Sequence, residues 1–199
     1  MSKLSGIRVI DLSLFLPGPM MTSMLADHGA EIIKIEPPGG DPARQMEPFE
    51  EGQSVWFRNI NRGKQSVVLD LKQKDNLQKL YGLVEESDIF VEAFRPGVAN
   101  RLEIDYETLS AINPRIIYCS ISAFGQDGPL AHHPAHDLAV EAFAGFMSVN
   151  DKGDGEPVVP AFPAADASAS LVALSGILMA LIGRELSLIH ISEPTRPRL

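Results

Sequence analysis

Apolar residues follow two repeating patterns along the first 125 positions of the chain. Short continuous apolar runs bounded by turn residues predict buried strands, and apolar residues with a period of about 3.6 predict helices. Leu77, Leu80 and Val84, for example, lie at i, i+3 and i+7 and would form one face of a helix. The predicted strands cover residues 7–12, 31–36, 65–71, 88–92 and 115–121.

These strands alternate with helices, which indicates βαβ units and an α/β fold built on a parallel sheet. The strands are apolar on both faces, so helices should cover the sheet on both sides. Pro19 suits the first turn of a helix that Gly29 would end. The remaining predictions are irregular structure over 41–64, a helix from 137 to about 147, and a long helix that Asp166 opens.

The last twelve residues differ in character from the rest of the chain. Residues 188–199 contain two prolines and two arginines and match neither period. We therefore expect one domain over residues 1–187, with its C-terminal part missing, followed by a disordered tail. The tail resembles the translated read-through of a sequencing adapter, so we expect the authentic sequence to diverge near Leu186.

The amino-acid composition excludes several classes of protein and of binding partner. Hydrophobic residues make up 45% and charged residues 22%, as is typical of a folded globular chain. The net charge of −9 disfavours a nucleic-acid partner, because an acidic chain repels phosphate backbones at long range. The single cysteine, Cys119, excludes an intrachain disulfide. The sequence has no run of about 18 unbroken apolar residues and no secretory signal, so we expect a soluble, cytoplasmic protein without membrane contact.

Six basic residues gather near the ends of the predicted strands. Ligands of open parallel sheets bind outside the carboxyl ends of the strands, and several cations there suit a ligand with several phosphates. Ordinary solvated cations would give the same spacing, and the spacing alone favours that interpretation. The glycine signatures of dinucleotide and P-loop sites are absent from the sequence, so a phosphate ligand would have to be held by other means. The six residues are Lys34, Arg62, Lys64, Lys72, Arg95 and Arg101.

Two further side chains could carry chemistry. Asp166 has only small neighbours, so it would either cap the long helix or attack an activated acyl group as an ionised nucleophile. Capping is the simpler interpretation. His136 could accept a proton near pH 7 with Asp137 beside it, although a loop histidine is more often a plain surface residue. The chain has no close-spaced cysteines to join His132 and His133, so no metal site is expected.

Several blocks spread over the chain carry a resemblance to a known family. The most specific block is Asn61-Arg-Gly-Lys-Gln-Ser-Val-Val-Leu-Asp-Leu-Lys72. Others lie at 4–12, 17–19, 25–37, 94–98, 125–129 and 163–167. Together they resemble the family III CoA-transferases, a group that also contains α-methylacyl-CoA racemase, from residue 4 to about residue 186. Pro37 departs from the pattern, since relatives often place an arginine there.

The resemblance implies a Rossmann-like large domain that binds coenzyme A, a small domain from the missing C-terminal part, and an interlocked homodimer. It places Asp166 on the catalytic aspartate, which attacks an acyl-CoA thioester to give a mixed anhydride and then an aspartyl-CoA thioester, before a carboxylic acid takes the CoA. Coenzyme A is thus a substrate, and no covalently bound cofactor is implied. The positions matched to CoA contacts are Leu69, Asp70, Leu71, Lys72, Ala93, Phe94, Arg95, Arg101, Ala135 and Asp137.

His136 separates two activities within this resemblance. In the racemase branch a His-Asp pair stands at this position, and the histidine exchanges the α-proton of a 2-methylacyl-CoA with the catalytic aspartate. The residues after each motif, at 138–140 and 167–170, depart from the racemase pattern. We therefore predict a CoA-transferase, with a racemase as the alternative. A non-catalytic CoA-binding fragment is a second alternative.

Overall fold

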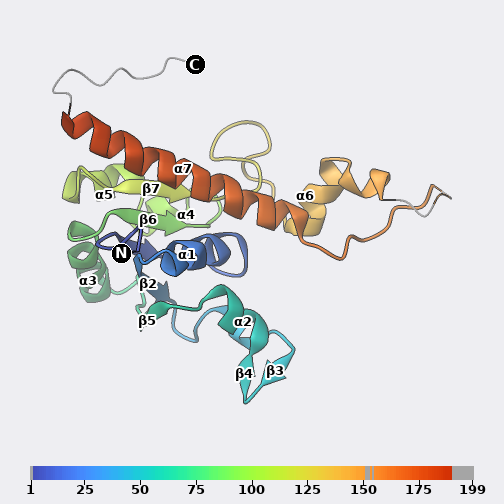
Figure 1. Cartoon of the computed structure of the whole chain (residues 1–199), viewed down its shortest axis with the longest axis horizontal. Helices are drawn as coiled ribbons and strands as arrows, with labels where there is room; N and C mark the ends of the chain where they lie inside the picture. Colours follow the sequence, from blue (N-terminus) through green and yellow to red (C-terminus); the bar gives the residue numbers. More distant parts are fainter. Residues whose placement is uncertain (1, 151–152, 154, 190–199) are drawn as a thin grey trace.

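The fold is built on a five-stranded parallel sheet (Figure 1). The computed structural model describes residues 2–150, 153 and 155–189. The strand order is β5-β2-β1-β6-β7, and every neighbouring pair in this sheet is parallel. This confirms the predicted α/β class. The strands are β1 (Arg8–Asp11), β2 (Glu31–Glu36), β5 (Lys64–Val68), β6 (Ile89–Glu92) and β7 (Ile117–Ser120).

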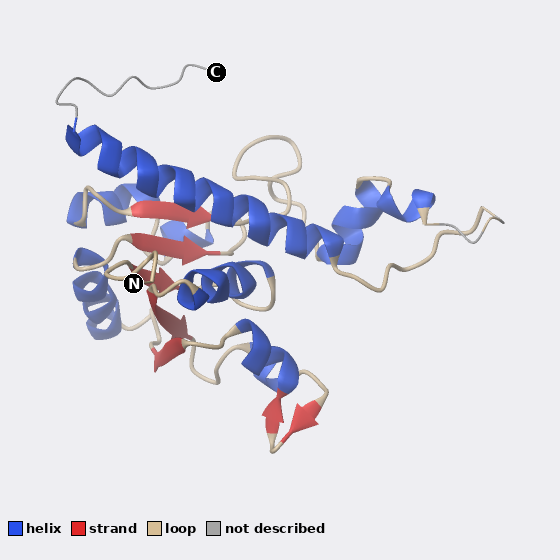
Figure 2. Ribbon diagram, in the orientation of Figure 1, coloured by secondary structure: helices blue, strands red, loops and turns tan. Residues whose placement is uncertain are grey.

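Helices cover both faces of the sheet, as the apolar strands predict (Figure 2). Successive residues of a strand point to opposite faces, so Val9 packs in one core and Ile10 in the other. The core around Val9 contains Met21 of α1 (Pro17–Asp27) and Ile177 of α7 (Ala164–Ile189). The core around Ile10 contains residues of α3 (Lys74–Glu85) and α5 (Tyr106–Ile112), and the short α4 (Val98–Arg101) adds Ala99.

The prediction of irregular structure over 41–64 is wrong. This segment forms a 3-10 turn η1 (Pro42–Gln45), a hairpin of β3 (Phe49–Glu50) with β4 (Gln53–Ser54), and α2 (Val55–Ile60). The polar residues that suggested a loop are caps, because the Asp41 side chain accepts the Ala43 N–H at 2.9 Å and Ser54 accepts the Phe57 N–H at 3.1 Å.

Helix boundaries also differ from the predictions near the C-terminus. α6 (Asp137–Phe143) ends before Gly145, whose φ of 77° breaks the helix, and a separate 3-10 turn η2 (Phe146–Val149) follows. α7 begins at Ala164, so Asp166 lies in its first turn and is not its N-cap. α7 runs to Ile189, so the first two residues assigned to the tail are helical. Residues 190–199 of that tail lie outside the described part of the chain.

α7 is also apolar along much of its length. Within the described residues, its segment Ala164–Leu186 is the one helix that is long and apolar enough to cross a membrane, judged by length and composition only. The sequence suggested no such span because Asp166, three serines and Arg184 divide this segment into apolar runs much shorter than 18 residues. Ile177 and Leu181 of this helix pack in the core beside α1, whereas Val172 and Met179 are mostly exposed.

Candidate active site

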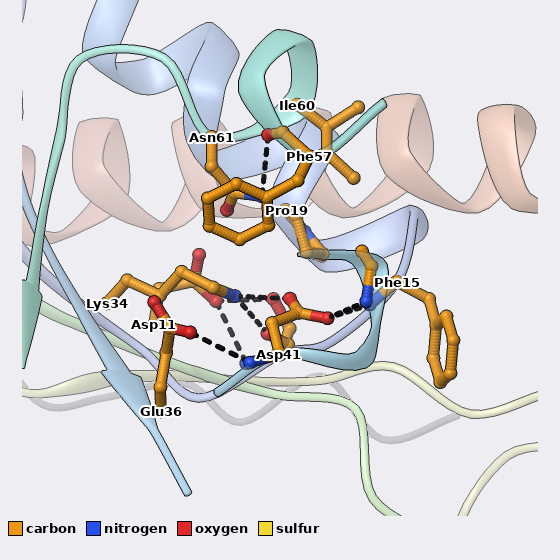
Figure 3. A network of polar contacts seen from close by, with 12 residues as sticks. Asp11, Phe15, Pro19, Lys34, Glu36, Asp41, Phe57, Ile60 and Asn61 are labelled. Atoms are coloured by element: carbon orange, nitrogen blue, oxygen red, sulfur yellow. Dashed lines mark hydrogen bonds and ion pairs between the residues drawn. The ribbon is translucent and has the colours of Figure 1, made fainter. Parts of the chain in front are cut away.

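A buried polar network lies where β1 and β2 end (Figure 3). Lys64 Nζ lies 3.0 Å from Asp11 Oδ2, and Lys34 Nζ lies 2.9 Å from Asp41 Oδ2. All four of these side chains are at most 2% exposed. Lys34 and Lys64 are therefore internal ion-pair partners, and the interpretation that they are solvated or phosphate-binding cations is wrong for both.

The charges in this network stabilise one another. Burial alone would raise the pKa of Asp11, but the ammonium groups of Lys64 and Lys34 outweigh it and lower the pKa to about 2. Burial lowers the pKa of Lys64 to about 8, although Asp11 opposes the shift. Thr22 Oγ1 donates to the same carboxylate oxygen as Lys64, Asp11 Oδ2, at 2.6 Å, so α1 is tied to the end of β1. Among the other predicted cations, Arg62 forms an ion pair with Asp27.

The three remaining cations are exposed. Within the described residues, the side chains of Lys72, Arg95 and Arg101 make no hydrogen bond or ion pair. Lys72 follows β5 in a turn where its N–H donates to Asp70 Oδ1 at 3.1 Å. Lys72 and Arg95 follow the carboxyl ends of β5 and β6, and Arg101 ends α4, so these unpaired cations are available to an anionic ligand.

A cavity of about 150 Å³ opens beside Lys72. It brings together five residues that the resemblance matches to CoA contacts. Arg95 lines a different cavity, of about 160 Å³, with Tyr118 and Gln126. Ala93 and Arg101 line neither cavity. The five grouped residues are Leu69, Asp70, Leu71, Lys72 and Phe94.

The N-terminus of α7 forms a second centre, held by α6. The Asp166 N–H donates to Asp137 Oδ1 at 2.9 Å, and the Ala164 N–H donates to Glu141 Oε1 at 2.7 Å. Two carboxylates of one helix thus cap the first turn of the next. The sequence analysis missed Glu141, although acidic residues at 137 and 141 share one face of a helix by their i, i+4 spacing. Ser170 Oγ donates to Pro17 O at 2.8 Å and ties this centre to α1.

Asp166 carries an unusual carboxyl group. Burial raises its pKa, the neighbouring carboxylates of Asp137 and Glu141 raise it further, and His136 opposes the shift, which leaves a pKa of about 6. Within the described residues its carboxylate accepts no hydrogen bond. Both flanking residues are alanines, so a bulky group could approach it. A carboxylate that is ionised at neutral pH but poorly solvated suits a nucleophile or a general base.

His136 lies next to this centre at the N-cap position of α6, but its side chain does not cap the helix. Its ring lies edge-on to the ring of Phe15, with the centroids 6.5 Å apart. Ala135 before it is partly buried. In the described part of the chain, no three His, Cys, Asp or Glu side chains are grouped as metal ligands. Burial raises the pKa of Cys119 to about 11, so this thiol stays protonated at neutral pH.

Comparison with known proteins finds relatives that are all named as CoA-transferases in the two examples that follow. Over 182 residues the chain is 46% identical to an acetyl-CoA:oxalate CoA-transferase of Acetobacter aceti, covering 90% of the chain and 47% of that protein. It is 40% identical over 187 residues to a succinate–glutarate CoA-transferase of Agrobacterium fabrum, again covering 90% of the chain and 47% of the relative. The chain therefore spans about half the length of the curated relatives it matches.

A solved structure shows the same fold. A CAIB/BAIF family protein from Brucella suis superposes with a TM-score of 0.90 at 35% identity, covering 94% of this chain and 50% of that protein. The family model described as CoA-transferase family III matches residues 4–187, which is nearly all of the described chain. Together with the sheet and the two centres at its carboxyl edge, this match shows that the chain belongs to CoA-transferase family III.

Proposed function

We propose that the protein moves coenzyme A from an acyl-CoA to a carboxylic acid, with Asp166 as the nucleophile. The observation that carries the proposal is the state of Asp166, a half-buried carboxyl group with a pKa of about 6 at the start of α7. At neutral pH most of it is ionised, yet burial leaves the carboxylate less solvated than a surface group and therefore more reactive. The two relatives described above are both named as CoA-transferases, which supports the same reaction class.

The proposed chemistry balances without an added cofactor. The Asp166 carboxylate attacks the thioester carbonyl, the C–S bond breaks, and CoA leaves as a thiolate from a mixed anhydride. The thiolate attacks the aspartyl carbonyl, which releases the donor carboxylate and leaves an aspartyl-CoA thioester. The acceptor carboxylate attacks this thioester and frees the thiolate again. The thiolate then attacks the acceptor carbonyl of the new anhydride, so the products are acceptor-CoA and free Asp166.

We assign coenzyme A to the carboxyl edge of the sheet. The cavity beside Lys72 is lined mainly by apolar groups, so it suits an apolar part of the ligand, while the exposed ammonium suits a phosphate. Arg95 and Arg101 would supply further charge. The residues Ala93, Ala135 and Asp137 remain assigned to CoA contacts by the family resemblance.

A racemase acting on a 2-methylacyl-CoA is the second candidate, supported by one observation. His136 is close enough for its charge to act on the pKa of Asp166, so an imidazole and a carboxyl group stand together as an acid–base pair. In that reaction one group removes the α-proton and the other returns a proton to the opposite face.

The deciding experiment uses the full-length protein, in the longest form that its gene encodes. It is incubated with a 2-methylacyl-CoA in D₂O without an acceptor acid, then with hydroxylamine. We expect an aspartyl adduct trapped at position 166 and no deuterium at the α-carbon. Deuterium incorporation that is lost in His136→Ala would contradict the transferase and support the racemase. Coenzyme A binding with neither outcome would support a non-catalytic fragment.

We also propose that the full-length protein is a homodimer in the cytoplasm. The face of α7 that points away from the sheet supports an interface, because it exposes Leu171, Val172, Met179 and Ile182. Light scattering coupled to size-exclusion chromatography tests the oligomeric state. A monomeric mass across micromolar concentrations would contradict the dimer.

A further inference from the structure

The loop between β1 and α1 contains an unfavourable backbone conformation. Phe15 has a φ of 58°, in the left-handed region where the β-carbon of a non-glycine residue is crowded. Such a conformation persists where the surrounding structure holds it, and it is frequent at functional sites. The side chain of Phe15 is 43% exposed and its ring lies edge-on to His136. The strained residue is thus also the one that contacts the candidate active site.

Two buried residues, Lys34 and Asp41, bind the backbone of this loop. Lys34 Nζ donates to Ser13 O at 2.7 Å and lies 2.9 Å from Asp41 Oδ2. Asp41 Oδ1 accepts the Phe15 N–H in a long hydrogen bond of 3.5 Å. In Figure 3 Asp41 stands between Lys34 and the backbone nitrogen of Phe15, and the phenyl ring points away from the network. The contacts therefore fix the loop backbone on both sides of Leu14 and leave the ring free to face outward.

The chemistry of the pair explains what it adds to the loop. Asp41 Oδ2 makes no hydrogen bond within the described residues, so its charge is compensated by the ammonium group of Lys34. A buried ion pair is often no more stabilising than apolar side chains of similar volume, because both charges lose their hydration. Unlike an apolar pair, it has directional contacts. Here those contacts reach Ser13 and Phe15 in the loop, and Asp41 Oδ1 also accepts the Ala43 N–H at 2.9 Å, which fixes the orientation of its carboxylate.

We propose that Lys34 and Asp41 are positioning residues that hold the 13–15 loop so that the Phe15 ring forms a wall beside His136 and Asp166. Neither residue touches the reacting atoms, and both act through Phe15. The catalytic consequence rests on the proposed function, because it assumes that the acyl group is held next to Asp166. A wall that shifts by about 1 Å can change a rate by up to ~10²-fold when the reacting groups must be aligned.

The first test is a double-mutant cycle in the full-length protein. Asp41→Asn and Phe15→Ala should each lower kcat for CoA transfer by at least ~10-fold, while the affinity for free CoA stays within about twofold because the exposed cations are unchanged. Adding Asp41→Asn to Phe15→Ala should then cost little more, since both changes remove the same wall. Losses that multiply would overturn the proposal. Asp88→Asn is the matched control, because it breaks the ion pair with Arg184 at the opposite edge of the sheet.

The second test does not depend on activity. 4-Fluorophenylalanine incorporated at position 15 should give one sharp fluorine resonance, and the paired variant Lys34→Met with Asp41→Asn should shift or broaden it. The double substitution removes both charges and leaves neither partner buried and unpaired, so the variant should fold even where a single substitution prevents folding. An unchanged resonance in the paired variant would overturn the proposal. If the resonance changes in the paired variant but the unmodified full-length protein transfers no CoA either, only the proposed function is contradicted.

Discussion

Replacing Asp166 with asparagine should make the protein more stable while it abolishes CoA transfer. The pKa of Asp166 is raised from 3.8 to about 6, by about 2 units. One unit corresponds to ~1.4 kcal/mol, so full burial would give about 3 kcal/mol of destabilisation from the ionised form. The group is only partly buried, so solvent screening reduces this to about 1–2 kcal/mol. Asparagine keeps the backbone N–H that donates to Asp137 and removes the charge.

The pH dependence fixes the sign of this effect. Because the folded state raises the pKa, it binds more protons than the unfolded state between about pH 4 and 6, so its stability falls as the pH rises through that window. The full cost is present above pH 6. The gain from Asp166→Asn should therefore appear at pH 7.5 and nearly vanish at pH 4.

Urea unfolding followed by circular dichroism measures the free energy of unfolding of the protein and of Asp166→Asn at pH 7.5 and at pH 4. We expect a midpoint increase at pH 7.5 that corresponds to about 1–2 kcal/mol at an unchanged m-value. Asp75→Asn is the control, because Asp75 is an exposed carboxylate in the first turn of α3. An equal gain in stability at both pH values, or no gain at pH 7.5, would refute the conclusion that burial and neighbouring carboxylates destabilise the ionised form of Asp166.

Other side chains give further tests. Lys72→Ala or Arg95→Ala should weaken CoA binding by ~1–3 kcal/mol in calorimetry and leave pantetheine binding unchanged, so an equal loss for both ligands would exclude phosphate contacts. Lys64→Met leaves the charge of Asp11 buried and should cost ~3–5 kcal/mol in urea unfolding, and a loss below about 1 kcal/mol would show that the pair is not coupled. The kcat/KM for CoA transfer should fall as the pH drops through about 6, where Asp166 is protonated, and a flat profile would argue against it as nucleophile.

The sheet was predictable because its signal is local. The predicted strand at 88–92 coincides with β6, whose apolar run Ile89-Phe-Val is buried, and a buried parallel strand needs little more than such a run. The elements within 41–64 were missed because each is short and begins with a polar cap such as Asp41 or Ser54. A pattern over a few residues cannot distinguish a cap from a loop residue, since the capping geometry depends on the chain that follows.

The site was predictable in its residue types and less so in its electrostatics. All six basic residues looked alike in sequence, yet Lys64 is paired with Asp11, 53 positions away, whereas Lys72 is exposed. Burial of a charge depends on a partner that only the fold supplies. Asp166 lies in the first turn of α7, two residues after the helix begins, and its raised pKa comes from burial and from Asp137 and Glu141 of another helix.

The four buried charges at the end of β1 and β2 constrain how this sequence can change over generations. Loss of any one of them leaves an opposite charge stranded in the interior, so a single substitution lowers stability before a second can restore it. Neutral drift through such an intermediate is slow, because a marginally stable protein tolerates few losses of that size. Substitutions at 34 and 41, or at 11 and 64, should therefore arise as matched pairs, and directed evolution that varies one position at a time should fail to change either pair.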